Sequence, residues 1–139
     1  MKNERSAGAV VFRKDKEIMY LLLHYEAKHW DFPKGNVEKG ETDIETVKRE
    51  IEEETGIKDV RIAPKFKEKM QYYFKFKDEL INKTVVFYLA RTETEHIKLS
   101  FEHIDSKWLA YDDAMDKLTF KNAKEILKKA NKFIKLHKS

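Results

Sequence analysis

Three carboxylates of the chain have the spacing of metal ligands on a helix. Glu50, Glu53 and Glu54 lie three and four residues apart, which brings their side chains onto one face of an α-helix. Like charges so close together repel each other, so this face favours a bound cation. Oxygen ligands suit a hard divalent ion such as Mg²⁺ or Mn²⁺, which commonly links carboxylates to substrate phosphates. A lone acidic run is also typical of a solvated helix face, so the surrounding residues decide between these interpretations.

The helix that carries these carboxylates has clear end signals. Thr42 and Glu45 form a T-x-x-E capping box, which predicts that the helix begins at Thr42. Gly56 predicts its end. The apolar stripe expected to face the core consists of Ile44, Val47 and Ile51. At 100° per residue this stripe lies about a quarter-turn from the carboxylates, so the helix can face a core and a cleft together.

The segment 35–57 resembles the Nudix box, G-x5-E-x7-R-E-U-x-E-E-x-G-U, in which U is an apolar residue. Every fixed position is filled, by Gly35, Glu41, Arg49, Glu50, Ile51, Glu53, Glu54, Gly56 and Ile57. The resemblance implies the Nudix fold, an α/β/α sandwich around a mixed β-sheet, and hydrolysis of nucleoside diphosphates linked to another moiety. It also implies a metal site that includes Gly35 and the three carboxylates. Arg49 is expected to hold Glu41 and so to pin the Gly35–Gly40 loop against the helix.

Length and composition indicate one small enzyme domain, residues 1–139. The net charge of +4, despite the acidic helix, would favour a polyanionic substrate, although solubilising lysine explains the C-terminal helix. The absence of cysteine excludes disulfides and Cys-ligated zinc. No apolar run is long enough to span a bilayer, and the N-terminus lacks the apolar core of a signal peptide. We therefore expect a cytoplasmic protein, with a monomer as the default state.

Apolar runs and turn signals predict alternating strands and helices. Strands are expected at residues 6–12 and 18–24 as a hairpin, and at 60–62, 65–76, 84–90 and 108–111. The run 84–90 is nearly continuous in apolar residues, which is typical of a central strand. A short helix is expected at 112–118. A longer amphipathic helix is expected near the C-terminus, and the apolar stripe that would face the core consists of Ala123, Ile126, Leu127, Ala130, Phe133 and Ile134.

The segments His29–Gly35, Lys83–Val85 and Phe101–His103 resemble the asymmetrical diadenosine tetraphosphate hydrolases of the animal and archaeal type. This resemblance covers nearly the whole chain. It implies that phosphate is bound by His29, Lys34 and Lys83, and that adenine is sandwiched between Tyr72 and Phe120. Relatives often carry Tyr at the position of Phe120, and a phenyl ring still stacks but donates no hydrogen bond. The resemblance further implies that Glu102 supplies an additional carboxylate, which either binds metal or acts as the general base.

Several of these assignments have alternatives. A one-residue register error would exchange Tyr72 with Tyr73, because neighbouring strand residues face opposite sides of a sheet. Phe120 could instead be a hydrophobic staple for the C-terminal helix, and Glu102 could be an ordinary exposed loop residue. Trp30 and Phe32 are expected to anchor the core or a loop. Only His29 among the five histidines is singled out by its surroundings.

These residues predict metal-dependent attack of water on a polyphosphate. The metal ions would neutralise phosphate charge and lower the pKa of a bound water. Glu53, Glu54 or Glu102 would accept the proton of this water. Arg49 is included with them among the expected catalytic residues. For diadenosine tetraphosphate, attack beside one adenosine releases AMP and ATP.

Two alternatives to this function remain. The first is a Nudix pyrophosphohydrolase of nucleoside triphosphates or RNA 5′-triphosphate ends, although the RNA-recognition signature of interleaved aromatics and glycines is missing. The second is a nucleotide-sensing domain without catalysis. Such domains typically lose box carboxylates, and here all are present. We therefore expect a small-molecule nucleotide ligand, with no stable nucleic-acid complex and no membrane partner.

Overall fold

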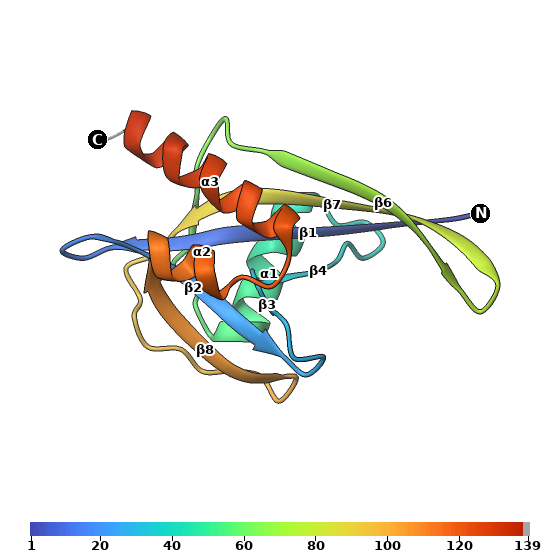
Figure 1. Cartoon of the computed structure of the whole chain (residues 1–139), viewed down its shortest axis with the longest axis horizontal. Coiled ribbons are helices and arrows are strands. Elements are labelled where there is room, and N and C mark those ends of the chain that lie inside the picture. The colour runs from blue at the N-terminus through green and yellow to red at the C-terminus, as the bar shows by residue number, and fades with distance from the viewer. Residues whose placement is uncertain (138–139) are drawn as a thin grey trace.

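The computed structural model describes residues 1–137, which form a mixed sheet with helices on both faces (Figure 1). The elements follow in the order β1 (Lys2–Lys14), β2 (Ile18–Tyr25), β3 (Trp30–Asp31), β4 (Lys34–Asn36), α1 (Asp43–Thr55), β5 (Arg61–Ile62), β6 (Glu68–Phe76), β7 (Glu79–Arg91), β8 (His103–Ala110), α2 (Tyr111–Lys117) and α3 (Lys121–Leu136). The predicted helices and strands are therefore all present in the predicted order.

Strand β1 lies at the centre of the sheet. It pairs in parallel with β7 and antiparallel with β2 and β4. Through these pairings the sheet has the order β3-β2-β1-β7-β5, and β6 and β8 add to β7 and β2. The predicted mixed sheet and the central position of the 84–90 run are confirmed.

The two faces of the sheet carry separate hydrophobic clusters. Along β1, Ala9 and Val11 belong to the cluster under α1, whereas Val10 and Phe12 belong to the cluster under α2 and α3. This alternation follows from the two-residue period of a strand. The predicted stripe of α3 is buried at Ala123, Ile126, Leu127, Ala130 and Ile134, and Phe133 packs against it. The predicted α/β/α sandwich is thereby confirmed.

Three strands are longer than their apolar runs suggested. β1 begins at Lys2 rather than at residue 6, and β7 begins at Glu79 rather than at residue 84. β8 begins at His103 instead of Trp108, and Tyr111 opens α2 instead of closing the strand. The added residues are mostly polar because these portions of the strands are largely exposed to solvent, where an apolar pattern is not required.

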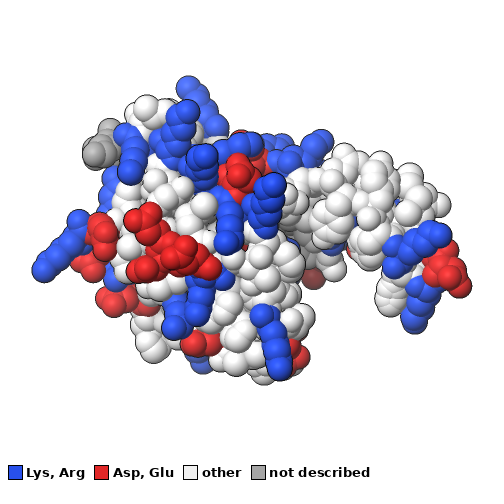
Figure 2. Space-filling model, in the orientation of Figure 1, with Lys and Arg blue, Asp and Glu red and all other residues white. Residues whose placement is uncertain are grey.

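The β6–β7 hairpin projects from the body of the molecule (Figure 1). Its tip residues Lys77 and Asp78 have positive φ values of 51° and 66°, as in the tight turns that match the twist of a hairpin. The face of this hairpin that is visible in Figure 2 is largely uncharged except at its tip, whereas Lys and Arg side chains gather over α3. Within residues 1–137, no helix has the length and apolarity needed to cross a membrane.

Candidate active site

Both ends of helix α1, which carries the acidic residues, are fixed by capping interactions. The Thr42 hydroxyl accepts from the Glu45 backbone N–H at 3.1 Å, and the Glu45 carboxylate accepts from the Thr42 N–H at 2.9 Å. The predicted capping box is therefore confirmed. Gly56 ends the helix with a φ of 78°, a left-handed conformation that glycine adopts without a Cβ penalty.

A loop after β7 docks on the C-terminal end of α1. The backbone N–H groups of Lys98 and Ser100 donate to the carbonyls of Thr55 and Glu54 at 2.9 and 3.4 Å. These carbonyls lack partners inside the helix, so the loop satisfies them and is held in register with the helix. The loop brings Glu102, whose side chain is exposed, to the same cavity as the carboxylates of α1.

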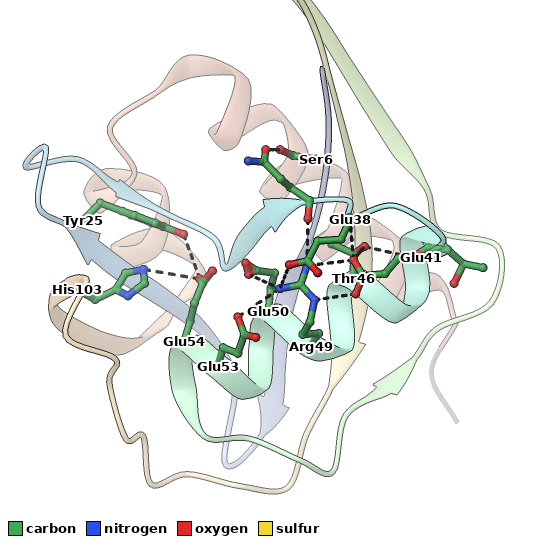
Figure 3. A network of polar contacts seen from close by, with 12 residues as sticks. Ser6, Tyr25, Glu38, Glu41, Thr46, Arg49, Glu50, Glu53, Glu54 and His103 are labelled. Atoms are coloured by element: carbon green, nitrogen blue, oxygen red, sulfur yellow. Dashed lines mark hydrogen bonds and ion pairs between the residues drawn. The ribbon is translucent and has the colours of Figure 1, made fainter. Parts of the chain in front are cut away.

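Arg49 connects α1 to the preceding loop (Figure 3). Its Nε lies 2.7 Å from Glu41 Oε2 and its Nη2 lies 3.0 Å from Glu41 Oε1, a two-pronged ion pair. Nη2 also donates to the Asn36 carbonyl at 3.0 Å. Nη1 lies 3.5 Å from Glu50 and 3.3 Å from Glu53. The predicted clamp between Arg49 and Glu41 is confirmed, and the same guanidinium offsets charge on two other carboxylates.

The carboxylates line a cavity of about 460 Å³ that we call the acidic half of the cleft. Its acidic lining residues are Glu38, Glu50, Glu53, Glu54 and Glu102. Glu54 is only 5% exposed, whereas Glu53 is exposed and turned toward Arg49. The four predicted carboxylates therefore reach one cavity from different depths.

Burial changes the ionisation of the deeper carboxylates. It raises the pKa of Glu54 to about 9 and that of Glu50 to about 7. The Glu50 charge raises the pKa of Glu54 further, while Arg49 opposes the shift at Glu50. A bound divalent cation would reverse these shifts because it stabilises the ionised form.

The donor set of the acidic half fits a hard divalent cation. A Cβ built on Gly35 would overlap the Glu50 carboxylate, so this carboxylate lies directly against the Gly35 backbone. Within residues 1–137, however, no three Asp, Glu or His side chains converge as a closed metal cage. The Glu53 carboxylate lies 3.3 Å from Arg49 Nη1.

A second cavity, of about 400 Å³, adjoins the first at Asn36, Glu50, Glu54 and Glu102. We call it the basic half of the cleft, since it is also lined by His29, Lys34, Tyr72 and Lys83. Lys34 Nζ lies 3.1 Å from Asp31, and Lys83 Nζ donates to the Asn36 side-chain oxygen at 3.1 Å. Burial lowers the pKa of Lys83, which the nearby Glu4 carboxylate opposes.

The two aromatic residues predicted to sandwich adenine, Tyr72 and Phe120, differ in their positions relative to the cleft. Tyr72 lines the basic half, and Tyr73 is on the other face of the hairpin because it pairs with Asn82 rather than Lys83. Phe120 does not line either half. It is the N-cap residue of α3, and its ring lies 5.3 Å from that of His29 at the rim. Phe32 is fully buried and Trp30 packs against the core, so the expected anchoring roles are confirmed.

The profile of the NUDIX domain matches residues 2–130. The chain belongs to the Nudix family. Its enzyme class, Nudix hydrolase, agrees with both the box residues and the sandwich that positions them.

This chain is similar to two curated relatives and to one solved structure over almost their full lengths. The chain is 34% identical to the mouse bis(5′-nucleosyl)-tetraphosphatase [asymmetrical], covering 94% of this chain and 95% of that protein. The Caenorhabditis elegans protein of the same name is 32% identical, covering 94% and 96%. A crystal structure described as a C. elegans Ap4A hydrolase binary complex superposes with a TM-score of 0.85 at 28% identity, covering 96% and 99%.

Sequence reasoning missed two residues beside Glu54 in this Nudix chain. The Tyr25 hydroxyl lies 3.4 Å from Glu54 Oε1, and His103 Nε2 lies 3.7 Å from the same oxygen (Figure 3). Both residues line the basic half of the cleft. No local motif indicates a role for Tyr25, because in the sequence it simply follows an apolar strand. The position of His103 directly after Glu102 was the available signal.

Proposed function

We propose that this chain is a divalent-metal-dependent hydrolase of dinucleoside polyphosphates that cleaves diadenosine tetraphosphate asymmetrically to ATP and AMP. One observation carries the proposal, namely that the acidic and basic halves form one cleft, with Glu50 and Glu54 lining both. The tetraphosphatase relatives, similar over nearly the whole chain, support this substrate class. We also propose that residues 1–139 act as one hydrolase domain.

The metal ions belong in the acidic half. We assign them to the carboxylates of Glu50, Glu53, Glu54 and Glu102, together with the backbone of Gly35, which lines the adjoining basic half and lies against the Glu50 carboxylate. Two of these carboxylates are buried or half-buried and have raised pKa values, so they form a site in which a cation is strongly favoured. When bound, Mg²⁺ or Mn²⁺ would neutralise phosphate charge and lower the pKa of a bound water.

The polyphosphate belongs in the basic half. Lys34, Lys83 and His29 supply donors at its wall, and donors fixed before reaction stabilise developing charge on phosphate oxygens. We assign Tyr72 to stack with an adenine, and its position on the same hairpin face as Lys83 supports this role. Phe120 would form the other side of the adenine site, reaching it at the rim beside His29.

The reaction itself is a direct displacement at phosphorus. A water oxygen attacks the phosphorus bonded to one adenosine, and its proton passes to Glu53, Glu54 or Glu102. The bond from that phosphorus to the next bridging oxygen breaks, so AMP keeps the new oxygen and ATP leaves with the bridging one. Arg49 does not touch the phosphates in this scheme, and it holds the loop and the flanking carboxylates in place.

The test is product analysis with Mg²⁺ and diadenosine tetraphosphate in water enriched in ¹⁸O. Equal amounts of ATP and AMP, with the label in AMP, are expected. Two molecules of ADP would overturn the assigned position of attack, and label in ATP would overturn the assigned phosphorus. No turnover would reject this substrate. Nucleoside triphosphates and triphosphorylated RNA would then distinguish another Nudix hydrolase from a nucleotide sensor.

A further inference from the structure

His103 is a buried, titratable residue of the cleft that the proposed reaction does not use. It is the first residue of β8 and pairs with Tyr25 of β2 where the register shifts. Its side chain is 1% exposed, and its Nε2 has no hydrogen-bond partner within residues 1–137. A buried nitrogen without a partner is unfavourable, so its location beside a buried carboxylate requires an explanation.

The other ring nitrogen is already engaged. Ser100 Oγ lies 2.9 Å from His103 Nδ1, and the His103 backbone N–H donates to the Ser100 carbonyl at 3.2 Å. Ser100 is itself tied to α1 through its backbone N–H, which donates to the Glu54 carbonyl. The turn at Ser100–His103 therefore orients the imidazole. The same turn is hydrogen-bonded to the backbone of Glu54, the residue whose carboxylate the imidazole faces.

Glu54 Oε1 needs a donor that Tyr25 does not fully supply. The Tyr25 hydroxyl has one proton, and its shorter bond, of 2.7 Å, goes to the Phe32 carbonyl. Its distance to Glu54 Oε1 is 3.4 Å. The Tyr25 ring instead packs edge-on against the His103 ring, with centroids 4.5 Å apart. His103 Nε2 is thus the remaining side-chain group placed to donate to Oε1.

We propose that Ser100 and His103 form a positioning pair for Glu54. The Ser100 hydroxyl donates to Nδ1, which fixes the neutral imidazole as its Nε2–H tautomer, and Nε2–H donates to Glu54 Oε1. The gap between 3.7 Å and a normal bond of ~2.9 Å is ~0.8 Å, which a small side-chain rotation closes. Both side-chain contacts are to Oε1, and the Lys34 backbone N–H also donates to the Glu54 carboxylate.

This role rests on the proposed function only for its effect on turnover. Partners of a metal-binding carboxylate typically change activity about 10- to 100-fold when removed. His103→Phe keeps an aromatic ring against Tyr25 but removes the donor, and Ser100→Ala removes only the partner of Nδ1. His103→Gln returns an N–H donor near the position of Nε2. His96→Phe is the matched control, because His96 is an exposed histidine of the same loop outside both halves of the cleft.

Two measurements on the full chain test the pair. Long-range ¹H–¹⁵N NMR with Mg²⁺ alone should find the His103 proton on Nε2, and Ser100→Ala should shift the Nδ1 resonance toward that of an unbonded nitrogen. With nucleotide, Ser100→Ala and His103→Phe should lower kcat about 10- to 100-fold with little change in KM. His103→Gln should recover most of that loss, and His96→Phe should behave as wild type.

A proton on Nδ1, or wild-type kcat in His103→Phe, would overturn the pair. If the wild-type chain turns over no nucleotide, the proposed function fails. The tautomer and its dependence on Ser100 then decide the positioning pair separately, since that measurement needs only Mg²⁺.

Discussion

Arg49 grips Glu41 with two guanidinium nitrogens, at 2.7 and 3.0 Å from its two carboxylate oxygens. This geometry lowers the pKa of Glu41 to about 2, with the backbone of Glu38 and the hydroxyl of Thr46 as further donors. A planar fork that matches a carboxylate fixes orientation as well as distance. Arg49 and Thr46 of α1 therefore hold the loop between β4 and α1 against the helix.

Arg49→Lys should loosen this loop. A lysine keeps the charge but cannot donate to both Glu41 oxygens and to the Asn36 carbonyl together. We expect a lower unfolding free energy and faster amide exchange in residues 36–41, because the loop loses donors from the helix. Urea unfolding and hydrogen exchange measure these effects, with Lys48→Arg as the exposed neighbouring control. Unchanged exchange in the loop would contradict the clamp.

Glu54→Gln should lower turnover at least ~100-fold while keeping the fold, because it removes one ligand charge from the metal site. Glu52→Gln is the matched control, since Glu52 is an exposed glutamate of the same helix that lies outside the cleft. Steady-state kinetics and circular dichroism of both variants decide the matter. Near-normal activity of a folded Glu54→Gln protein would reject the metal assignment.

The metal-free protein should lose stability as the pH rises. The pKa of Glu54 moves from an ordinary 4.5 to about 9 on folding, so the folded state binds this proton more tightly than the unfolded state. That contribution is complete below pH 4.5 and is lost as the pH rises toward 9. Urea titrations in EDTA should show this decline, and Glu54→Gln should flatten it. An equally steep decline in the variant would assign it to other groups.

Tyr72→Ala and Tyr73→Ala test the register of the hairpin. Only Tyr72 shares a face with Lys83 and lines the cleft. Since stacking mainly contributes ground-state binding, Tyr72→Ala should raise KM several-fold more than it lowers kcat. Tyr73→Ala should leave both constants near wild type. The opposite result would place the other face of the hairpin toward the nucleotide.

Phe120→Ala should likewise raise KM more than it lowers kcat, through loss of stacking at the rim. Phe76→Ala is a fair control because both rings are 49% exposed, and Phe76 is on the projecting hairpin away from the cleft. An unchanged KM in Phe120→Ala, with lower thermal stability, would make Phe120 only a packing residue of α3.

The acidic helix was predictable because its signals are local. The capping box, Gly56 and the Arg49–Glu41 pair lie within one short segment, and the structure has each of them as expected. The sandwich was predictable for a related reason, since alternation along β1 already separates the residues of its two faces. A cytoplasmic location and a monomeric state stay predictions.

The contacts around Glu54 were not predictable in this way. Its burial depends on Tyr25 and on the turn at Ser100–His103, which are 29 and about 46–49 residues away in the chain. Whether an acidic residue on a helix lies deep or shallow depends on what covers it, and periodicity does not encode the covering loop. The polar start of β8 was missed because it pairs with β2 through its backbone while Ile104, Asp105 and Lys107 are exposed, so no apolar pattern marks it.

The parallel ladder between β1 and β7 also governs how the chain reaches this structure. It joins Lys2 to Ile81 and continues to the pair Phe12–Arg91, so its two strands are about 79 residues apart in sequence. Long loops must close before such contacts form, which slows folding. During synthesis the apolar run of β1 leaves the ribosome well before its partner exists. One edge of the central strand therefore stays without its partner until β7 has been synthesised.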